Sequence, residues 1–223
     1  MPMHGFAKDR RFELVSQSAA RASWRLVDDP EMRAIYPFAF DLSVEYAVAA
    51  ETLTIAAAVV NRDSSPMPMC FGFHPGLRWP LAGIGAKEDY RLDFPEAEGP
   101  TVWRASGGYI LPDPVPNPMQ GRELDLRLTE FATGAWIFRD LHSRAVGFRC
   151  GDATLLRVAF DGCANLGLWA KPGGDFLCIE PWNGLPQIAD FDGDLAERPG
   201  IVVLAPGATA RMSLRIAVGD AVG

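Results

Sequence analysis

The sequence predicts an all-β protein, a large antiparallel β-sandwich. Apolar residues alternate with polar or small residues in one segment after another. A period of two is the pattern of a strand with one buried face. No stretch shows the 3.6-residue period of a long amphipathic helix. The 22 glycines and 18 prolines of the 223-residue chain are spread along its length and mark many turns, as in proteins made of short strands.

The clearest predicted strand pair covers residues 38–61. Phe38, Phe40 and Leu42 begin an alternation that runs to Val48, and after a turn at 49–52 the segment 53–61 returns. The same alternation predicts further strands at residues 22–27, 123–128, 145–149, 155–160 and 212–218. We expect one helical turn within residues 129–136 and an extended loop with three prolines at residues 113–121.

Length and composition favour a single domain over residues 1–223. A chain of this length with 48% hydrophobic residues can bury a substantial core, and it contains no repeat and no low-complexity tract. The net charge is −7 and no run of lysine or arginine occurs, so nucleic acid is not expected as a partner.

No membrane association is expected either. The longest mainly apolar stretch, Leu53 to Val60, is too short to span a bilayer, and the first residues lack the basic-then-apolar pattern of a signal peptide. The four cysteines show no C-x-x-C spacing and are expected to be reduced, mostly buried thiols of a cytoplasmic protein.

Two stretches share the pattern apolar, small, apolar, ionisable, proline. They are FGFHP at residues 71–75, which presents His74, and LCIEP at residues 177–181, which presents Glu180. Strand alternation sends the apolar residues to one face and the small and ionisable residues to the other. Proline favours extended backbone before it and lacks an N–H for the ladder. We therefore expect each stretch to present its ionisable group at a strand end, with open space beside it.

A histidine and a glutamate presented in this way suit proton transfer. Histidine has a reference pKa near 6.5, and a carboxylate on a partly apolar face has a raised pKa that makes it a better base. The spacing of His74 and Glu180 does not show whether they meet. From the pattern alone, a structural histidine and a carboxylate in a turn or a surface ion pair stay open as alternatives.

Five stretches of the sequence match a known family and stand in the family's order. They are residues 4–14, 36–48, 59–81, 178–190 and 200–216. In these stretches the chain resembles the aldose 1-epimerase (mutarotase) family, and within it the LacX-like and hexose-6-phosphate mutarotase-like branches. This resemblance implies the galactose mutarotase-like supersandwich, in agreement with the period of two.

The resemblance also implies roles for individual residues. His74 matches the general acid that protonates the sugar ring oxygen, and Glu180 matches the general base that takes the proton of the anomeric hydroxyl. His4 matches a substrate-contacting histidine, and Lys8 stands where that motif usually has arginine. A lysine can contact a hydroxyl or a phosphate as a point charge, but it cannot form the bidentate contact of an arginine.

The implied function is interconversion of the α and β anomers of an aldohexose or a hexose phosphate. The reaction needs two proton transfers and a bond rotation, so no cofactor is expected. Trp182 is a candidate stacking surface for the sugar and Arg78 a candidate contact for an anionic substrate, whereas Trp79 is expected in the core. Three scattered histidines without ligand-like spacing predict no metal site.

Members of the family usually carry further strands before the motif that contains His4. We therefore expect this chain to lack those strands, and the sheet edges left open could pair with another chain, which leaves a homodimer open. Two other functions also stay open. One is a non-catalytic carbohydrate-binding protein, and the other is a glycosidase in which Asp175 or Asp190 would be the second carboxylate beside Glu180.

Overall fold

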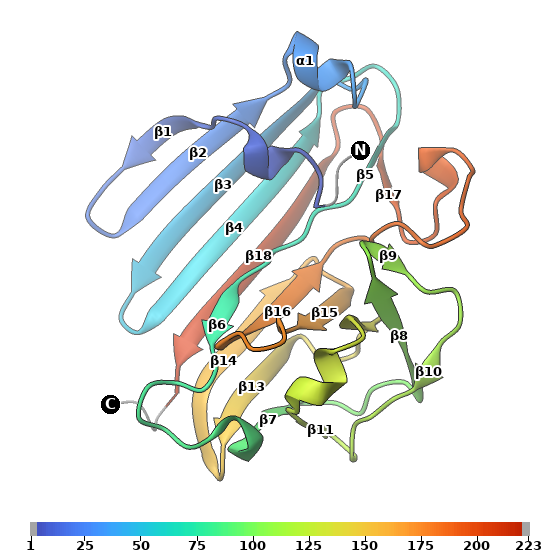
Figure 1. The fold of residues 1–223 in the computed structure, drawn as a ribbon. Helices are drawn as coiled ribbons and strands as arrows, with labels where there is room; N and C mark the ends of the chain where they lie inside the picture. The colour runs from blue at the N-terminus through green and yellow to red at the C-terminus, as the bar shows by residue number, and fades with distance from the viewer. Residues whose placement is uncertain (1–3, 220–223) are drawn as a thin grey trace.

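The computed structural model describes residues 4–219, and within this range the chain forms two antiparallel sheets and one short two-stranded ribbon (Figure 1). This architecture confirms the predicted all-β sandwich. The helices of the described range are short and consist of α1 (Pro30–Arg33) and the 3-10 turns η1 (Ala7–Asp9), η2 (Lys87–Asp89), η3 (Leu128–Phe131) and η4 (Leu195–Glu197). None of these helices has the length and hydropathy to cross a bilayer.

Nine strands of the described range form the large sheet, which runs from the upper left of Figure 1 to the lower part of the molecule. In spatial order they are β1 (Glu13–Gln17), β2 (Arg21–Val27), β3 (Phe40–Ala49), β4 (Thr52–Asn61), β18 (Thr209–Val218), β14 (Ala153–Asp161), β13 (Ala145–Cys150), β7 (Tyr90–Asp93) and β11 (Glu123–Asp125).

The small sheet covers one part of the large sheet. In spatial order its strands are β10 (Val115–Pro116), β8 (Thr101–Ser106), β12 (Ala135–Phe138), β15 (Asn165–Trp169), β16 (Phe176–Trp182) and β6 (Gly76–Arg78), with β9 (Tyr109–Ile110) paired to β8. The separate ribbon joins β5 (Met67–Met69) to β17 (Val202–Leu204).

The predicted strand pair at residues 38–61 is the hairpin of β3 and β4. Its register places Leu42 opposite Val59 and Tyr46 opposite Ile55, so the apolar residues of both strands share one face. The strands predicted at 22–27, 145–149, 155–160 and 212–218 lie within β2, β13, β14 and β18. The strand predicted at 123–128 was too long, because β11 ends at Asp125 and a 3-10 turn begins at Leu128.

The core lies between the two sheets. Leu166 and Leu168 of β15 and Ile179 of β16 are fully buried against the large sheet, where Val158 and Leu214 are fully buried as well. Strand alternation places the residues between them on the opposite face of the small sheet. That second face of the small sheet carries the candidate site.

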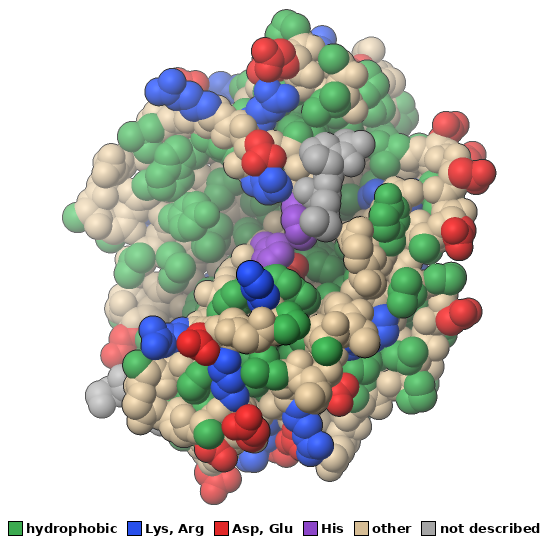
Figure 2. Space-filling model, in the orientation of Figure 1, with side chains coloured by type: hydrophobic (Ala, Val, Ile, Leu, Met, Phe, Trp, Pro, Cys, Tyr) green, Lys and Arg blue, Asp and Glu red, His purple; other side chains and the backbone are tan. Residues whose placement is uncertain are grey.

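The large sheet extends beyond the small sheet and leaves a cleft. Along β3, Leu42 is buried, whereas Tyr46 and Val48 on the same face are exposed. The cover over this face therefore ends midway along the strand. Figure 2 shows a hollow on this side of the molecule, with hydrophobic side chains along one wall and histidine side chains (purple) inside it.

The four cysteines all lie within the described range and are free thiols. Cys163 and Cys178 are buried, as expected, and Cys150 is partly buried. Cys70 is exposed, so the expectation of burial was wrong for this residue.

Candidate functional site

The two stretches with the shared pattern are antiparallel neighbours. Gly76 of β6 lies opposite Cys178 of β16, and an isolated bridge joins Gly72 to Trp182. Both pairs belong to one register, so His74, midway between Gly72 and Gly76, lies opposite Glu180. Residues opposite one another in an antiparallel pair share a face of the sheet. The fold therefore brings together the two ionisable groups that the sequence left unconnected.

The prolines explain why the ladder is interrupted at this pair. In the antiparallel pattern, the backbone hydrogen bonds on either side of the His74–Glu180 pair would be donated by residues 75 and 181. Both are prolines and have no N–H. The next backbone hydrogen bonds between the two segments are present. The Phe73 N–H donates to the carbonyl of Pro181 at 3.1 Å, and the Asn183 N–H donates to the carbonyl of Phe71 at 2.9 Å.

Two details of the predicted strand ends are wrong. Residues 71–75 do not close a regular strand, because β5 ends at Met69 and β6 begins at Gly76. Pro181 does not end β16, which continues to Trp182, since a proline loses only its donor and its carbonyl still accepts a bond.

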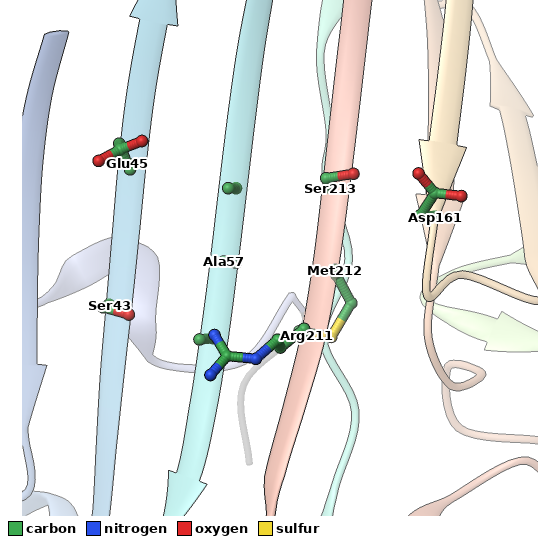
Figure 3. A pocket seen from close by; sticks show the side chains of 9 residues that line it. Ser43, Glu45, Ala57, Asp161, Arg211, Met212 and Ser213 are labelled. Carbon is green, nitrogen blue, oxygen red and sulfur yellow. The ribbon is translucent and has the colours of Figure 1, made fainter.

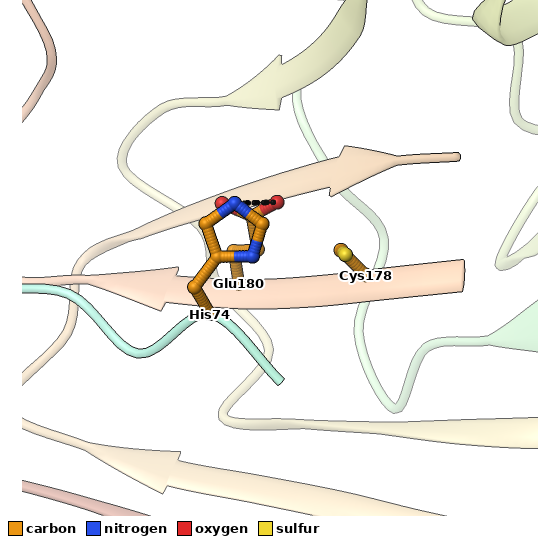
Figure 4. A group of neighbouring side chains, drawn as sticks. All are labelled: His74, Cys178 and Glu180. Carbon is orange, nitrogen blue, oxygen red and sulfur yellow. Dashed lines mark ion pairs between the residues drawn. The ribbon is translucent and has the colours of Figure 1, made fainter. Parts of the chain in front are cut away.

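The imidazole and the carboxylate lie close together in the cleft. His74 Nε2 is 3.4 Å from Glu180 Oε1, and Figure 4 shows the His74 ring over the Glu180 carboxylate. The Glu180 side chain is only 6% exposed, whereas that of His74 is 40% exposed. The carboxylate therefore forms the floor of the site, and the imidazole lies between it and the solvent.

Burial acts on these two groups in opposite directions. It raises the pKa of Glu180 from 4.5 to about 8, and a hydrogen bond from Trp182 opposes this rise by a smaller amount. Burial lowers the pKa of His74, and the nearby charge of His4 lowers it further. Over the neutral range these shifts leave the pair with one proton, which Glu180 carries in the free protein, and transfer of this proton to His74 gives the tautomer with a free base at Glu180 and an acid at His74.

The Trp182 indole lies in a slot between two glycines. A Cβ at Gly72 would lie 2.3 Å from Trp182 Cδ1, and a Cβ at Gly167 would lie 2.4 Å from Cζ2, both far inside van der Waals contact. The open space predicted beside His74 at Gly72 is therefore filled by this ring. Because the ring also hydrogen-bonds Glu180, the slot holds the carboxylate indirectly.

Two aromatic rings surround His74. The His4 ring lies edge-on to the His74 ring with 5.1 Å between their centroids, and the Trp169 ring lies edge-on at 6.5 Å. His4 precedes η1 and is exposed. The first described residue therefore lies beside His74, and its contact with a substrate stays a prediction.

The other predicted site residues have partners of their own. Lys8 is exposed and its Nζ lies 2.6 Å from Asp9 Oδ2. Arg78 is at the far end of β6, opposite Phe176, and its charge acts on the pKa of Asp175. No hydrogen bond or ion pair within the described range joins Lys8 or Arg78 to His74 or Glu180. Trp79 is fully buried in the core, as expected.

The structure adds two residues that the sequence reasoning did not assign to the site, Trp169 and Cys178. Cys178 shares the face of Glu180, two positions earlier on β16, and burial raises the pKa of its thiol to about 12. Trp169 lies opposite Cys178 on β15. The alternation in residues 165–169 was the available signal, because it sends Gly167 and Trp169 to the face opposite Leu166 and Leu168.

A separate shallow depression lies on the outer face of the large sheet, across β3, β4, β18 and β14 (Figure 3). Alanines form its floor. Its carboxylates are engaged outside it, because Glu45 accepts hydrogen bonds from Arg21 and Ser23 and Asp161 accepts one from Arg215. This depression contains no histidine and does not adjoin the pair in the cleft.

Comparisons with known proteins show what the chain is similar to. The family model described as aldose 1-epimerase matches residues 1–103. The protein LacX of Lactococcus lactis subsp. lactis, in its plasmid and chromosomal forms, is 29% identical over 221 residues, which cover 96% of this chain and 74% of LacX.

Solved structures share the fold. A galactose mutarotase related enzyme from Lactobacillus acidophilus has a TM-score of 0.85 and 25% identity, over 96% of this chain and 73% of that one. A galactose mutarotase-like protein from Lactobacillus casei has a TM-score of 0.86 and 24% identity, over 98% of this chain and 76% of that one. These likenesses confirm the resemblance that the sequence motifs carry.

Proposed function

We propose that this chain, which is similar to LacX and to the aldose 1-epimerase family model, interconverts the α and β anomers of an aldohexose or a hexose phosphate. The observation that supports this activity best is the 3.4 Å approach of His74 Nε2 to Glu180 Oε1 in an open cleft. The two groups face the same space and together hold one proton at neutral pH.

The proposed reaction uses the pair as acid and base. The reacting tautomer has the proton of the pair on His74. Glu180 then takes the proton of the anomeric hydroxyl while His74 gives its proton to the ring oxygen, and the bond between C1 and the ring oxygen breaks. The aldehyde then rotates about its bond to C2, and closure on its other face returns both protons. Each positioned acid or base typically contributes ~10²- to 10⁴-fold to the rate.

Trp182 acts in this proposal as a positioning residue. Its indole hydrogen-bonds Glu180 and is itself held by the slot at Gly72 and Gly167. Trp169 and His4 flank the imidazole and offer ring surfaces and a polar nitrogen to a sugar. The partner is therefore a small sugar or sugar phosphate, bound by one domain that we expect to act in the cytoplasm.

The geometry gives little support to the glycosidase alternative. Such enzymes canonically place two carboxylates on either side of the scissile bond. The Asp175 carboxylate is 73% exposed and lies 2.8 Å from Lys87 Nζ, which lowers its pKa. The group that faces Glu180 is an imidazole and not a second carboxylate.

The test is anomer exchange in the presence of the protein. Polarimetry follows freshly dissolved α-aldohexoses, and magnetisation-exchange NMR follows hexose 6-phosphates. We expect acceleration over buffer for at least one of these sugars. Binding seen by calorimetry without acceleration of any sugar would instead support the non-catalytic carbohydrate-binding alternative.

A further inference from the structure

Three side chains with metal-binding atoms meet at the floor of the cleft. One ligand atom each from His74, Cys178 and Glu180 lies within 4.8 Å of the other two. Figure 4 shows the imidazole in front of the Glu180 carboxylate, with the Cys178 side chain to one side of them on β16. The first of these residues is half-exposed, and the other two are buried.

The antiparallel register creates this cluster. Cys178 and Glu180 alternate onto the same face of β16, and His74 lies opposite Glu180 in the neighbouring segment. Both segments are anchored on their other face by buried residues, Phe73 in the segment before β6 and Ile179 in β16. Sites on such rigid elements hold their geometry well, so the three ligands converge without any rearrangement of the backbone.

An imidazole nitrogen, a thiolate sulfur and a carboxylate oxygen are ligands that zinc uses in proteins. With bonds of about 2.0–2.3 Å, the ligand atoms of a tetrahedral zinc site lie roughly 3.3–3.8 Å apart. The His74–Glu180 distance of 3.4 Å already falls in this range. The other two distances are at most 4.8 Å, so they exceed this range by about 1 Å at most.

We propose that His74, Cys178 and Glu180 form a reversible Zn²⁺ site whose occupation blocks the cleft. Three protein ligands leave one tetrahedral position open toward the cleft for water. Binding releases two protons to solvent, that of the Cys178 thiol and the one that the His74–Glu180 pair holds, and three metal–ligand bonds form in their place. The ion takes the electron pairs that His74 and Glu180 need for proton transfer, so a zinc-loaded protein does not turn over sugar.

Only the inhibition rests on the proposed function; binding of the ion does not. Binding is therefore tested first with Co²⁺, a spectroscopic substitute for Zn²⁺, on the full chain without sugar. We expect one equivalent of Co²⁺ to produce a thiolate-to-metal charge-transfer band, and Zn²⁺ to displace it. A wild-type protein that shows no such band, or no displacement, would overturn the proposal.

Cysteine variants identify the ligand. Cys178→Ser should lose the band, and Cys70→Ser, at an exposed cysteine elsewhere, should keep it. A band that survives in Cys178→Ser, or disappears in Cys70→Ser, contradicts the site. His74→Ala offers a second variant at a half-exposed position. Its Zn²⁺ affinity should fall by more than the ~10- to 100-fold that loss of an outer-shell partner causes.

Inhibition is measured afterwards, if the protein accelerates anomer exchange. Zn²⁺ should abolish the wild-type rate and a chelator should restore it, whereas Cys178→Ser should be far less sensitive relative to its own zinc-free rate. If Co²⁺ binds through Cys178 but no sugar is turned over, the site stands and the epimerase proposal fails. If sugar is turned over but the cobalt band is absent, the epimerase proposal stands and the metal site is wrong.

Discussion

His74 lies directly opposite Glu180 in the antiparallel register that joins Gly72 to Trp182 and Gly76 to Cys178. Two prolines remove both backbone hydrogen bonds that would flank this pair. The segment around His74 is joined to β16 instead by the backbone hydrogen bonds of Phe71 and Phe73 and by the regular pairing of β6. The ionisable groups thus sit at a break in the ladder, between two well-paired regions.

Replacing the proposed base should remove most of the activity. We expect Glu180→Gln to lower kcat/KM for anomer exchange by at least ~10²-fold, because the amide keeps the shape of the side chain but cannot accept a proton. His74→Asn should lower kcat/KM for anomer exchange by a similar factor. Polarimetry in the presence of a chelator provides the measurement.

Asp175→Asn is the matched control for these variants. Its carboxylate is exposed and paired with Lys87, so the substitution should change stability little and leave the rate near that of the wild type. A Glu180→Gln protein with full activity would remove Glu180 from the role of base.

The buried carboxylate should also mark the pH dependence of stability. The pKa of Glu180 is about 8 in the folded protein and 4.5 ordinarily, so between these values the folded state binds more protons than the unfolded state. Unfolding free energy therefore falls as pH rises through this window, by up to about 1.4 kcal/mol per pH unit from this group. Below pH 4.5 the carboxyl is protonated in both states and this penalty is absent.

Glu180→Gln removes the titrating group, so the fall in unfolding free energy that this group causes should be absent from the variant. We expect the stability of the variant relative to the wild type to increase from pH 5 to pH 8 and then to level off. Urea unfolding followed by circular dichroism at a series of pH values gives the comparison. Stability curves that stay parallel across the window would show that the folded protein does not raise this pKa.

The glycine slot of Trp182 should not accept a methyl group. Gly72→Ala places a Cβ 2.3 Å from the indole, so the ring must move. Overpacking of this kind typically costs about 1–3 kcal/mol. We expect a lower melting temperature, a changed near-ultraviolet circular dichroism signal and a reduced kcat, because Glu180 loses the hydrogen bond of Trp182.

Gly76→Ala is the control from the same segment. Its Cβ would lie 3.6 Å from the Phe176 ring, which is ordinary contact, so stability and spectrum should stay close to the wild type. If Gly72→Ala behaves like Gly76→Ala in all three measurements, the indole does not depend on the slot.

Much of the fold and of the site could be predicted from alternation alone. A period of two shows which side chains share a face, and it correctly sent Phe73 and Ile179 to the core and Cys178 to the face of Glu180. Alternation also predicted the hairpin at residues 38–61. Its two strands are neighbours in the sequence, and the short turn between them brings them into antiparallel pairing.

The neighbours of each residue across the sheet could not be predicted in this way. Pairing between residues 72–78 and 176–182 is set by packing of the whole sheet and not by local preference. For this reason Gly72 was interpreted as open space, although the ring of Trp182 fills it. For the same reason a three-ligand cluster was not expected from histidines and cysteines that are scattered in the sequence.

The charge of His4 should be measurable at His74. The two rings lie 5.1 Å apart, and the charge of His4 lowers the pKa of His74 in addition to the larger effect of burial. His4 has a φ of 66°, a conformation that asparagine accepts readily, so His4→Asn removes the charge with little backbone strain. We expect the pKa of His74 to rise in this variant and to stay below its ordinary 6.5, because burial remains. Proton NMR titration of the three histidine rings gives the values, with the exposed His142 ring, which contacts the Ala97 carbonyl, as the internal reference. A His74 titration that is identical in both proteins would show that His4 does not act on the imidazole in solution.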